Sequence, residues 1–391
     1  MLLCFLARRI FQICVGHFVD DFVGIENSQT IHSGFDAFSA VFRCFGLNMK
    51  DKKSLAPSSH QKILGVMVHI RDSDIVLSPH PDRLEKLRNA LLKIQTQQFL
   101  SVLEAQRIAG KLVFLTSSLF GQLGKSAIHP FYVFAHSGAK DVHHDALPVA
   151  MNCAIRTLLM LFDALQPRLI STRVLSRPGV LYTDAFFKKG DHTFSAGHCC
   201  PTGLWAKSRC HQFENGWGFV CHIYHHTVFA AGSVPPRVLR AFCERRAFIY
   251  FLEIVAQLIA MAVLRNHFPA LIIALIDNQA GLSGLLKGYG KDSCINNLLA
   301  FIWRLICHFG WNIHFEWVPS SLNMSDSVSR FDFSDMTALK ATRVHFNLDP
   351  LWKILIRVAN DLEYAHSSAL DDLLLQLPAS DLTFQCTGSV G

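Results

Sequence analysis

One apolar segment constrains the fold of this chain more than any other. Residues 248–264 read FIYFLEIVAQLIAMAVL, and only Glu253 and Gln257 interrupt the apolar run. A membrane-spanning helix needs about 20 apolar residues and disfavours buried charge, so the segment falls short of one. A helix that is apolar on all sides must be covered by other elements. We therefore expect a buried core helix in a chain of 391 residues, of which 50% are hydrophobic.

Glu253 is the unusual residue of this helix. An unpaired carboxylate inside a core costs several kcal/mol. A positive charge should therefore lie against it. Arg245 or Arg246, just before the helix, could supply that charge in a structural ion pair, and a metal ion is the alternative.

The sequence around this helix alternates between strand and helix patterns. Such alternation predicts an α/β or α+β domain, a mixed sheet with helices packed on it. The expected strands are 180–187, two near 217–232, 270–277 and 311–318, and the expected helices are 242–264, 279–287, 292–309 and a short one after Pro319.

Four acidic residues lie at element ends or inside this predicted core. Asp184 and Asp277 each end an apolar strand, Glu253 lies in the apolar helix, and Asp326 begins a helix. Clustered carboxylates are what a two-metal site needs. Each residue also has a plainer interpretation: Asp277 and Asp326 as helix caps, and Asp184 as a turn residue.

The first half of the chain predicts a hairpin followed by helices. Residues 11–25, FQICVGHFVDDFVGI, are two β-rich runs with Asp20 and Asp21 at the turn. A helix is expected at 32–46. A strand follows at 63–70, in which Gly65 could allow a neighbouring backbone to approach closely.

From Pro81 the apolar residues recur at helical spacing, which predicts an amphipathic helix. Its other faces carry Arg83, Lys86, Arg88 and Lys93, which either contact nucleic-acid phosphates or form an ordinary solvated surface. Ser101 and Glu104 have the form of a capping box for a helix at 101–117. Linkers are expected at 137–147 and 166–179, on either side of a helix at 148–165.

Four motifs of the second half occur together in one known family. They are LYTDA at 181–185, FLEIVAQ at 251–257, ALIDNQAGLSGLLKG at 274–288 and EWVPSSLNMSDSVSR at 316–330. In this order they resemble the ribonuclease H domain of retrotransposon polymerases, closest to the tyrosine-recombinase (DIRS-like) class. The resemblance implies that the chain hydrolyses the RNA strand of RNA–DNA hybrids. It makes Asp184, Glu253, Asp277 and Asp326 ligands of two Mg²⁺ or Mn²⁺ ions, with Asn278 contacting the nucleic acid.

The first half resembles the reverse transcriptase of the same retroelements. FVDD at 18–21 is similar to the catalytic turn of the palm, GLNMKDKKS at 46–54 and ILGVMV at 63–68 to the next two palm motifs, and 100–132 to the thumb. The likeness implies metal-binding roles for Asp20 and Asp21 and a primer-grip position for Gly65. Because the family's remaining palm ligand would precede residue 11, we expect no polymerase activity from this chain alone.

The chain departs from the family pattern at three positions. Phe18 stands where the family has Tyr, Phe186 where Ser is common, and Ser321 where many relatives carry a His that helps product release. The last difference affects the expected rate. If the chemistry has been lost, the alternative is a non-catalytic nucleic-acid-binding remnant of a decayed retrotransposon.

The resemblance divides the chain into five parts. These are the C-terminal part of the palm at 1–80, thumb-like helices at 81–140, a connection at 141–177, a ribonuclease H-like domain at 178–333 and a tail of unknown role at 334–391.

Charge and targeting features are mild. The formal net charge of +7 fits a polyanionic partner without requiring one. The N-terminal residues MLLCFLARRIFQIC place their arginines after the apolar run and show no cleavage site, unlike a signal peptide. We expect an intracellular protein without a membrane segment.

A cluster of cysteines and histidines within residues 198–226 is a possible metal site. Zinc sites have regular paired spacings, which this cluster lacks, and an irregular insertion between strands is the other interpretation. Its members are His198, Cys199, Cys200, Cys210, His211, Cys221, His222, His225 and His226.

Overall fold

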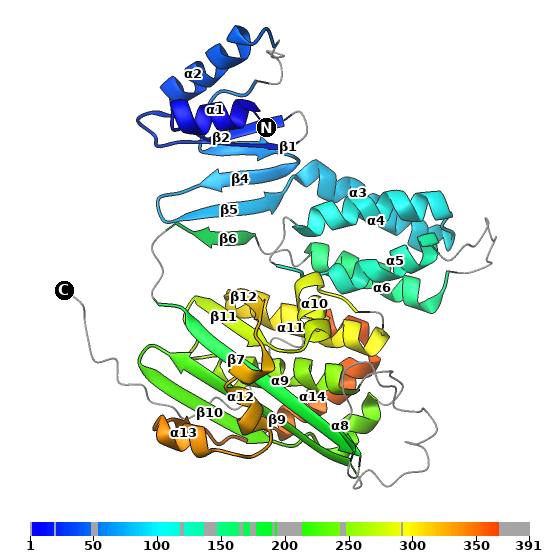
Figure 1. Cartoon of the computed structure of the whole chain (residues 1–391). Coiled ribbons are helices and arrows are strands. Elements are labelled where there is room, and N and C mark those ends of the chain that lie inside the picture. The colour runs from blue at the N-terminus through cyan, green and yellow to red at the C-terminus, as the bar shows by residue number, and fades with distance from the viewer. Residues whose placement is uncertain are drawn as a thin grey trace.

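The computed structural model shows a mixed α and β protein (Figure 1). It describes residues 2–18, 21–47, 54–117, 121–136, 147–163, 167–172, 177–189, 192–193, 213–242, 248–290 and 292–366. Within these ranges, no helix has both the length and the apolar character needed to cross a membrane.

The N-terminal part is a hairpin with two helices against it. β1 (Cys14–Phe18) and β2 (Asp21–Ile25) pair antiparallel, and the last pair is Phe18 with Asp21. The predicted hairpin is therefore confirmed with Asp21 at its tip, while Asp20 lies outside the described residues. The helices are α1 (Leu2–Ile10) and α2 (Ile31–Cys44).

A second, antiparallel sheet follows, in the order β3-β4-β5-β6. The apolar run at 63–70 is not one strand, because a turn at Leu64 and Gly65 divides it. The predicted linker at 166–179 is wrong in part, since it contains β6, which hydrogen-bonds to β5 and completes this sheet. The strands are β3 (His60–Ile63), β4 (Val66–Ile70), β5 (Asp74–Pro79) and β6 (Arg168–Ser171).

Four helices with their own apolar core lie beside this sheet (Figure 1). One half of the capping box predicted for the second helix is present, because the Ser101 hydroxyl accepts a hydrogen bond from the Glu104 backbone N–H at 3.2 Å. Most of the predicted 137–147 linker lies outside the described residues. The helices are α3 (Pro81–Gln97), α4 (Val102–Ser117), α5 (Lys125–His136) and α6 (Val149–Asp163).

The second half is a mixed sheet in the order β12-β11-β7-β9-β10-β13, with β8 on the end of β7. β12, β11 and β7 are parallel, while β9 is antiparallel to β7 and to β10. The strands are β7 (Gly179–Lys189), β8 (His192–Thr193), β9 (Phe213–Ile223), β10 (His226–Gly232), β11 (Leu271–Ile276), β12 (Asn312–Trp317) and β13 (Thr342–Arg343).

Helices cover both faces of this sheet, as the alternation along β9 shows. Phe219, Cys221 and Ile223 belong to the large core shared with α9 and α11, whereas Val220 belongs to a smaller core with Val328 of α12. Successive strand residues point to opposite faces, so both faces are apolar here. The helices are α8 (Pro236–Ala241), α9 (Phe248–Leu264), α10 (Gln279–Lys287), α11 (Ser293–Phe309), η3 (Ser320–Leu322), α12 (Ser325–Ser329) and α13 (Ser334–Ala338).

The segment after residue 333, to which the sequence assigns no role, contributes to the large core. α14 (Asp349–Asn360) and α15 (Leu362–His366) follow β13, and Trp352 and Leu355 of α14 are buried against α11. α15 also packs on α6, where Glu363 pairs with Arg156. Residues 334–366 thus join the helical part to the mixed sheet.

Removing core volume from α14 should therefore destabilise the mixed-sheet half. Leu355 is fully buried, and Leu355→Ala should lower the free energy of unfolding by about 2 to 5 kcal/mol. Lys353→Ala, on the exposed side of the same helix, should change it by less than about 0.5 kcal/mol. Urea unfolding measures both, and an equal effect of the two variants would show that α14 is not part of the core.

Candidate metal centre

Strand register brings two of the predicted acids together. β11 and β7 are parallel, and Ile276 pairs with Thr183. The next residues of each strand path, Asp277 and Asp184, are therefore neighbours. β11 ends at this point, whereas β7 continues to Lys189. Both carboxylates therefore lie where β7 no longer has β11 as its neighbour.

The core helix α9 supplies the third acid. Glu253 and Gln257 are four residues apart and so lie on one face of the helix. The Gln257 side-chain amide donates to the Thr183 hydroxyl at 2.7 Å, and Glu253 accepts a hydrogen bond from the backbone N–H of Ala185. These two contacts hold α9 across β7 and direct Glu253 toward Asp184 and Asp277.

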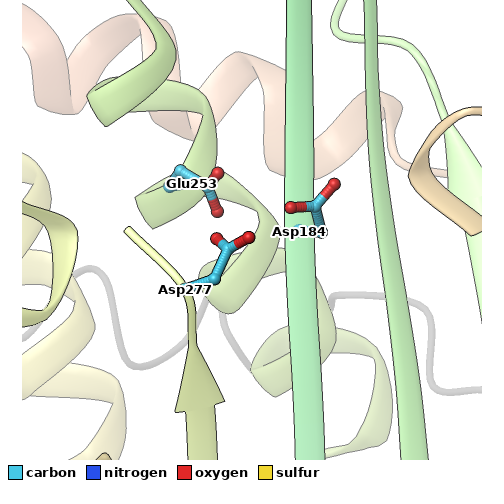
Figure 2. Close-up of side chains that lie close together, drawn as sticks. All are labelled: Asp184, Glu253 and Asp277. Atoms are coloured by element: carbon cyan, nitrogen blue, oxygen red, sulfur yellow. The ribbon is translucent and has the colours of Figure 1, made fainter. Parts of the chain in front are cut away.

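The three carboxylates form one compact group, shown in Figure 2. One oxygen from each of Asp184, Glu253 and Asp277 lies within 4.8 Å of the others. Asp184 and Glu253 are buried, with 2% and 3% of their surface exposed, while Asp277 is partly exposed. Three segments separated by up to 93 positions (277 − 184) thus meet in a space that could hold a metal ion.

The raised pKa values of these acids indicate that a cation would stabilise the group. Burial, followed by the Asp277 and Asp326 charges, raises the pKa of Asp184 to about 8 against the hydrogen bond from Ser329. Burial and then the Asp184 and Asp277 charges raise the pKa of Glu253 well above its ordinary value. Glu253 Oε2 has no hydrogen-bond partner among the described residues. An all-oxygen donor set with a free buried oxygen fits a hard divalent cation.

Asp326 lies next to this group without joining it. Its carboxylate is held by the guanidinium of Arg330, with Nη2 to Oδ1 at 3.0 Å and Nε to Oδ2 at 3.3 Å. Its charge still raises the pKa of both Asp184 and Glu253. The structure therefore brings together three of the four predicted acids and places the fourth beside them in an ion pair.

The helix that carries Asp326 rests directly on the sheet because of two glycines. A Cβ on Gly218, which pairs with Asp184, would lie 2.5 Å from the Ser329 backbone nitrogen, and one on Gly216 would lie 2.3 Å from the Ser329 carbonyl oxygen. This approach lets the Ser329 hydroxyl hydrogen-bond to Asp184 Oδ2. Sequence reasoning missed all three residues, although the alternating glycines of NGWG at 215–218 were a visible sign.

Two neighbours of Asp277 have structural roles that the sequence did not give them. The Oδ1 of Asn278 caps α10 by accepting from the Gly281 N–H at 2.8 Å, and its contact with nucleic acid stays a prediction. Trp317, at the end of β12, donates its indole N–H to the Asp277 carbonyl oxygen at 3.0 Å. Both contacts fix the backbone on which the Asp277 carboxylate stands.

The predicted phosphate-contacting residues of α3 fall into two groups. Arg83 donates to the Leu64 carbonyl oxygen and lies over the Phe114 ring, and a Cβ on Gly65 would be 2.3 Å from its Nη1. Gly65 thus accommodates the Arg83 side chain and not a neighbouring backbone. Arg88 pairs with Asp163, whereas Lys86 and Lys93 are exposed.

The cysteine and histidine cluster does not come together in the part that is described. His198, Cys199, Cys200, Cys210 and His211 lie outside it, as do Arg245 and Arg246. Cys221 is buried in the large core, while the adjacent His222 contacts Met324, just before α12, on the other face of the sheet. These two residues cannot share an ion, because neighbouring strand residues point to opposite faces.

No family model matches the chain, and no curated protein is similar to it.

The raised pKa of Asp184 predicts how stability depends on pH without metal. Between pH 4 and about 8 the unfolded chain loses this proton while the folded chain keeps it, so the free energy of unfolding should fall as pH rises through that window. Asp184→Asn removes this loss. In EDTA at pH 8 the variant should be more stable than the natural chain by at least about 1 kcal/mol.

Adding millimolar Mg²⁺ should reverse that order, since a bound cation stabilises only the chain that retains its ligands. Asp36→Asn, an exposed aspartate of α2, is the matched control and should follow the natural chain. Thermal unfolding measures all three proteins. An Asp184→Asn variant less stable than the natural chain in EDTA would contradict this account.

Proposed function

We propose that this chain is a metal-dependent nuclease of the ribonuclease H type, from the polymerase of a DIRS-like retrotransposon, which hydrolyses the RNA strand of an RNA–DNA hybrid. The observation that carries the proposal is the convergence of Asp184, Glu253 and Asp277 within 4.8 Å. These acids come from three of the four motifs that resemble this family. The mixed sheet with flanking helices is also the kind of fold that the resemblance implies.

The donor set suits Mg²⁺ or Mn²⁺, and a pair of ions is the form expected for phosphodiester hydrolysis. Bound there, such ions would activate a water molecule and stabilise the charge on the leaving 3′-oxygen. Asp184, Glu253 and Asp277 would hold them, and Asp326, whose charge acts on Asp184 and Glu253, would be available as a further ligand once Arg330 releases it.

The remaining residues of the site position these groups. Ser329 orients Asp184 through its hydroxyl, and Trp317 and Asn278 fix the main chain on both sides of the Asp277 carboxylate. Arg330 brings a positive charge to the rim of an acidic site, where it limits the repulsion between the carboxylates and a phosphate that approaches. The Arg330 side chain is 45% exposed, so its guanidinium can also contact that phosphate.

A nucleic-acid partner is supported by the exposed lysines of α3. Lys86 and Lys93 are seven residues apart, which is two helical turns and therefore one side of the helix. Neither forms an ion pair with any residue in the described ranges. They can contact backbone phosphates without reading sequence.

A cleavage assay tests the proposal. The natural chain should cut the RNA of a labelled RNA–DNA hybrid slowly, only with Mg²⁺ or Mn²⁺, and should not cut single-stranded RNA. Asp277→Asn should lower the cleavage rate at least about 100-fold, as expected when a group that holds the reacting centre is lost. It should leave hybrid binding largely intact.

Asp335→Asn, an exposed aspartate of α13, is the matched control and should cut like the natural chain. If the folded, metal-loaded protein cuts no better than Asp277→Asn while still binding hybrid, the chain is a non-catalytic nucleic-acid-binding protein.

A further inference from the structure

A second group of polar side chains lies where α5 meets the turn between α10 and α11. Gly288, which ends α10, fits closely against the start of α5, since a Cβ on it would lie 2.4 Å from the Gln122 Cβ and 3.2 Å from the Lys125 Cβ. The rings of His129 and Tyr289 are 5.6 Å apart. Lys125, His129, Tyr132 and Tyr289 together form what we call the junction cluster.

The junction cluster is rich in hydrogen-bond donors. Lys125, His129 and Tyr132 follow one another at spacings of four and three, so they share a face of α5. Each of the four side chains can donate an N–H or O–H, and none carries a negative charge at neutral pH. All four are partly exposed, and none hydrogen-bonds or forms an ion pair with a residue in the described ranges.

In the part of the chain that the structure describes, Lys125 is half-buried and has no anion beside it. Burial lowers the pKa of Lys125, and no acid of the described chain offsets this. Burial likewise lowers the pKa of His129. The nearest acid along the α10–α11 turn, Asp292, is engaged as the cap of α11 through the backbone N–H groups of Cys294 and Ile295. The cluster is therefore a partly desolvated site whose lysine has no counterion among the described residues.

We propose that the junction cluster binds a backbone phosphate of the same nucleic-acid duplex that occupies the acid site, the group of Asp184, Glu253 and Asp277. The identity of the ligand, an RNA–DNA hybrid, rests on the function proposed above. The place of the contact rests on the four side chains of the junction cluster. A phosphate brings the negative charge that Lys125 lacks and acceptors for the His129, Tyr132 and Tyr289 donors.

The position of the cluster fits one duplex spanning both sites. α10 begins two residues after Asp277 and ends at Gly288, and its nine residues cover about 13 Å at 1.5 Å per residue. A duplex strand advances about 3.4 Å per nucleotide along its axis. The length of α10 thus corresponds to about four nucleotides of a duplex strand, which is short enough for one hybrid to contact both sites.

Salt-dependent binding tests the proposal directly. Affinity for a fluorescein-labelled 20-base-pair RNA–DNA hybrid is measured by anisotropy across KCl concentrations, with every protein carrying Asp277→Asn so that no RNA is cut. Lys125→Met keeps the length of the side chain and removes its charge. It should weaken binding several-fold and reduce the slope of log affinity against log salt by about 0.9. Tyr289→Phe should weaken binding less and keep the slope.

Two controls separate phosphate binding from structural effects. Lys353→Met, on the exposed side of α14, removes the same charge elsewhere. Unlike Lys125→Met, it should leave both the affinity and the slope unchanged. Thermal unfolding should show Lys125→Met at least as stable as its parent, because Lys125 has no hydrogen-bond or ion-pair partner to lose among the described residues. A clear loss of stability would assign Lys125 a structural role and overturn the proposal.

The outcomes distinguish the two proposals. If Lys125→Met behaves like Lys353→Met, the junction cluster does not bind phosphate, whatever the cleavage assay shows. If no chain cleaves RNA but Lys125→Met still reduces the slope, the nuclease proposal fails and the junction cluster stands. If the hybrid does not bind at all, both fail.

Discussion

Mutual repulsion among three clustered carboxylates, two of them buried, is the constraint on which this structure depends. At separations near 4.8 Å, each like-charged pair costs about 3 kcal/mol at an effective dielectric constant of 20. The fold holds the group together through a fixed strand register, through α9 lying across β7 and through the close packing of α12 on Gly216 and Gly218. Such an arrangement is stable either with protons on the acids or with a cation between them, and a cation allows all three to stay charged at neutral pH.

The same constraint explains why the core helix has its unusual composition. α9 is buried on nearly all sides, so its apolar residues serve the core, and its two polar residues both face β7. Gln257 fixes the helix to Thr183 while Glu253 reaches the acid group one turn earlier. A displacement of α9 along its axis would break the Gln257 contact and remove Glu253 from the other acids together, so core packing and site geometry are coupled.

Much of this site could be predicted from the sequence, because its signals are local. An acid at the end of an apolar strand, as at Asp184 and Asp277, and a carboxylate inside an apolar helix, as at Glu253, are visible without a structure. The roles of Asp326, Asn278 and Arg83 were not, because each depends on a contact that only the fold creates: with Arg330, with the α10 backbone, and with the turn at Gly65. β6 was missed for a similar reason, since its short sequence becomes a strand only where β5 offers an edge.

Anomalous diffraction from crystals grown with Mn²⁺ would show whether Asp184, Glu253 and Asp277 bind a divalent cation. We expect a manganese peak among the three carboxylates, with Glu253 Oε2 as one of its ligands, and loss of that peak in crystals of Glu253→Gln. An ordered site without manganese, in crystals that contain the ion in solution, would contradict this expectation.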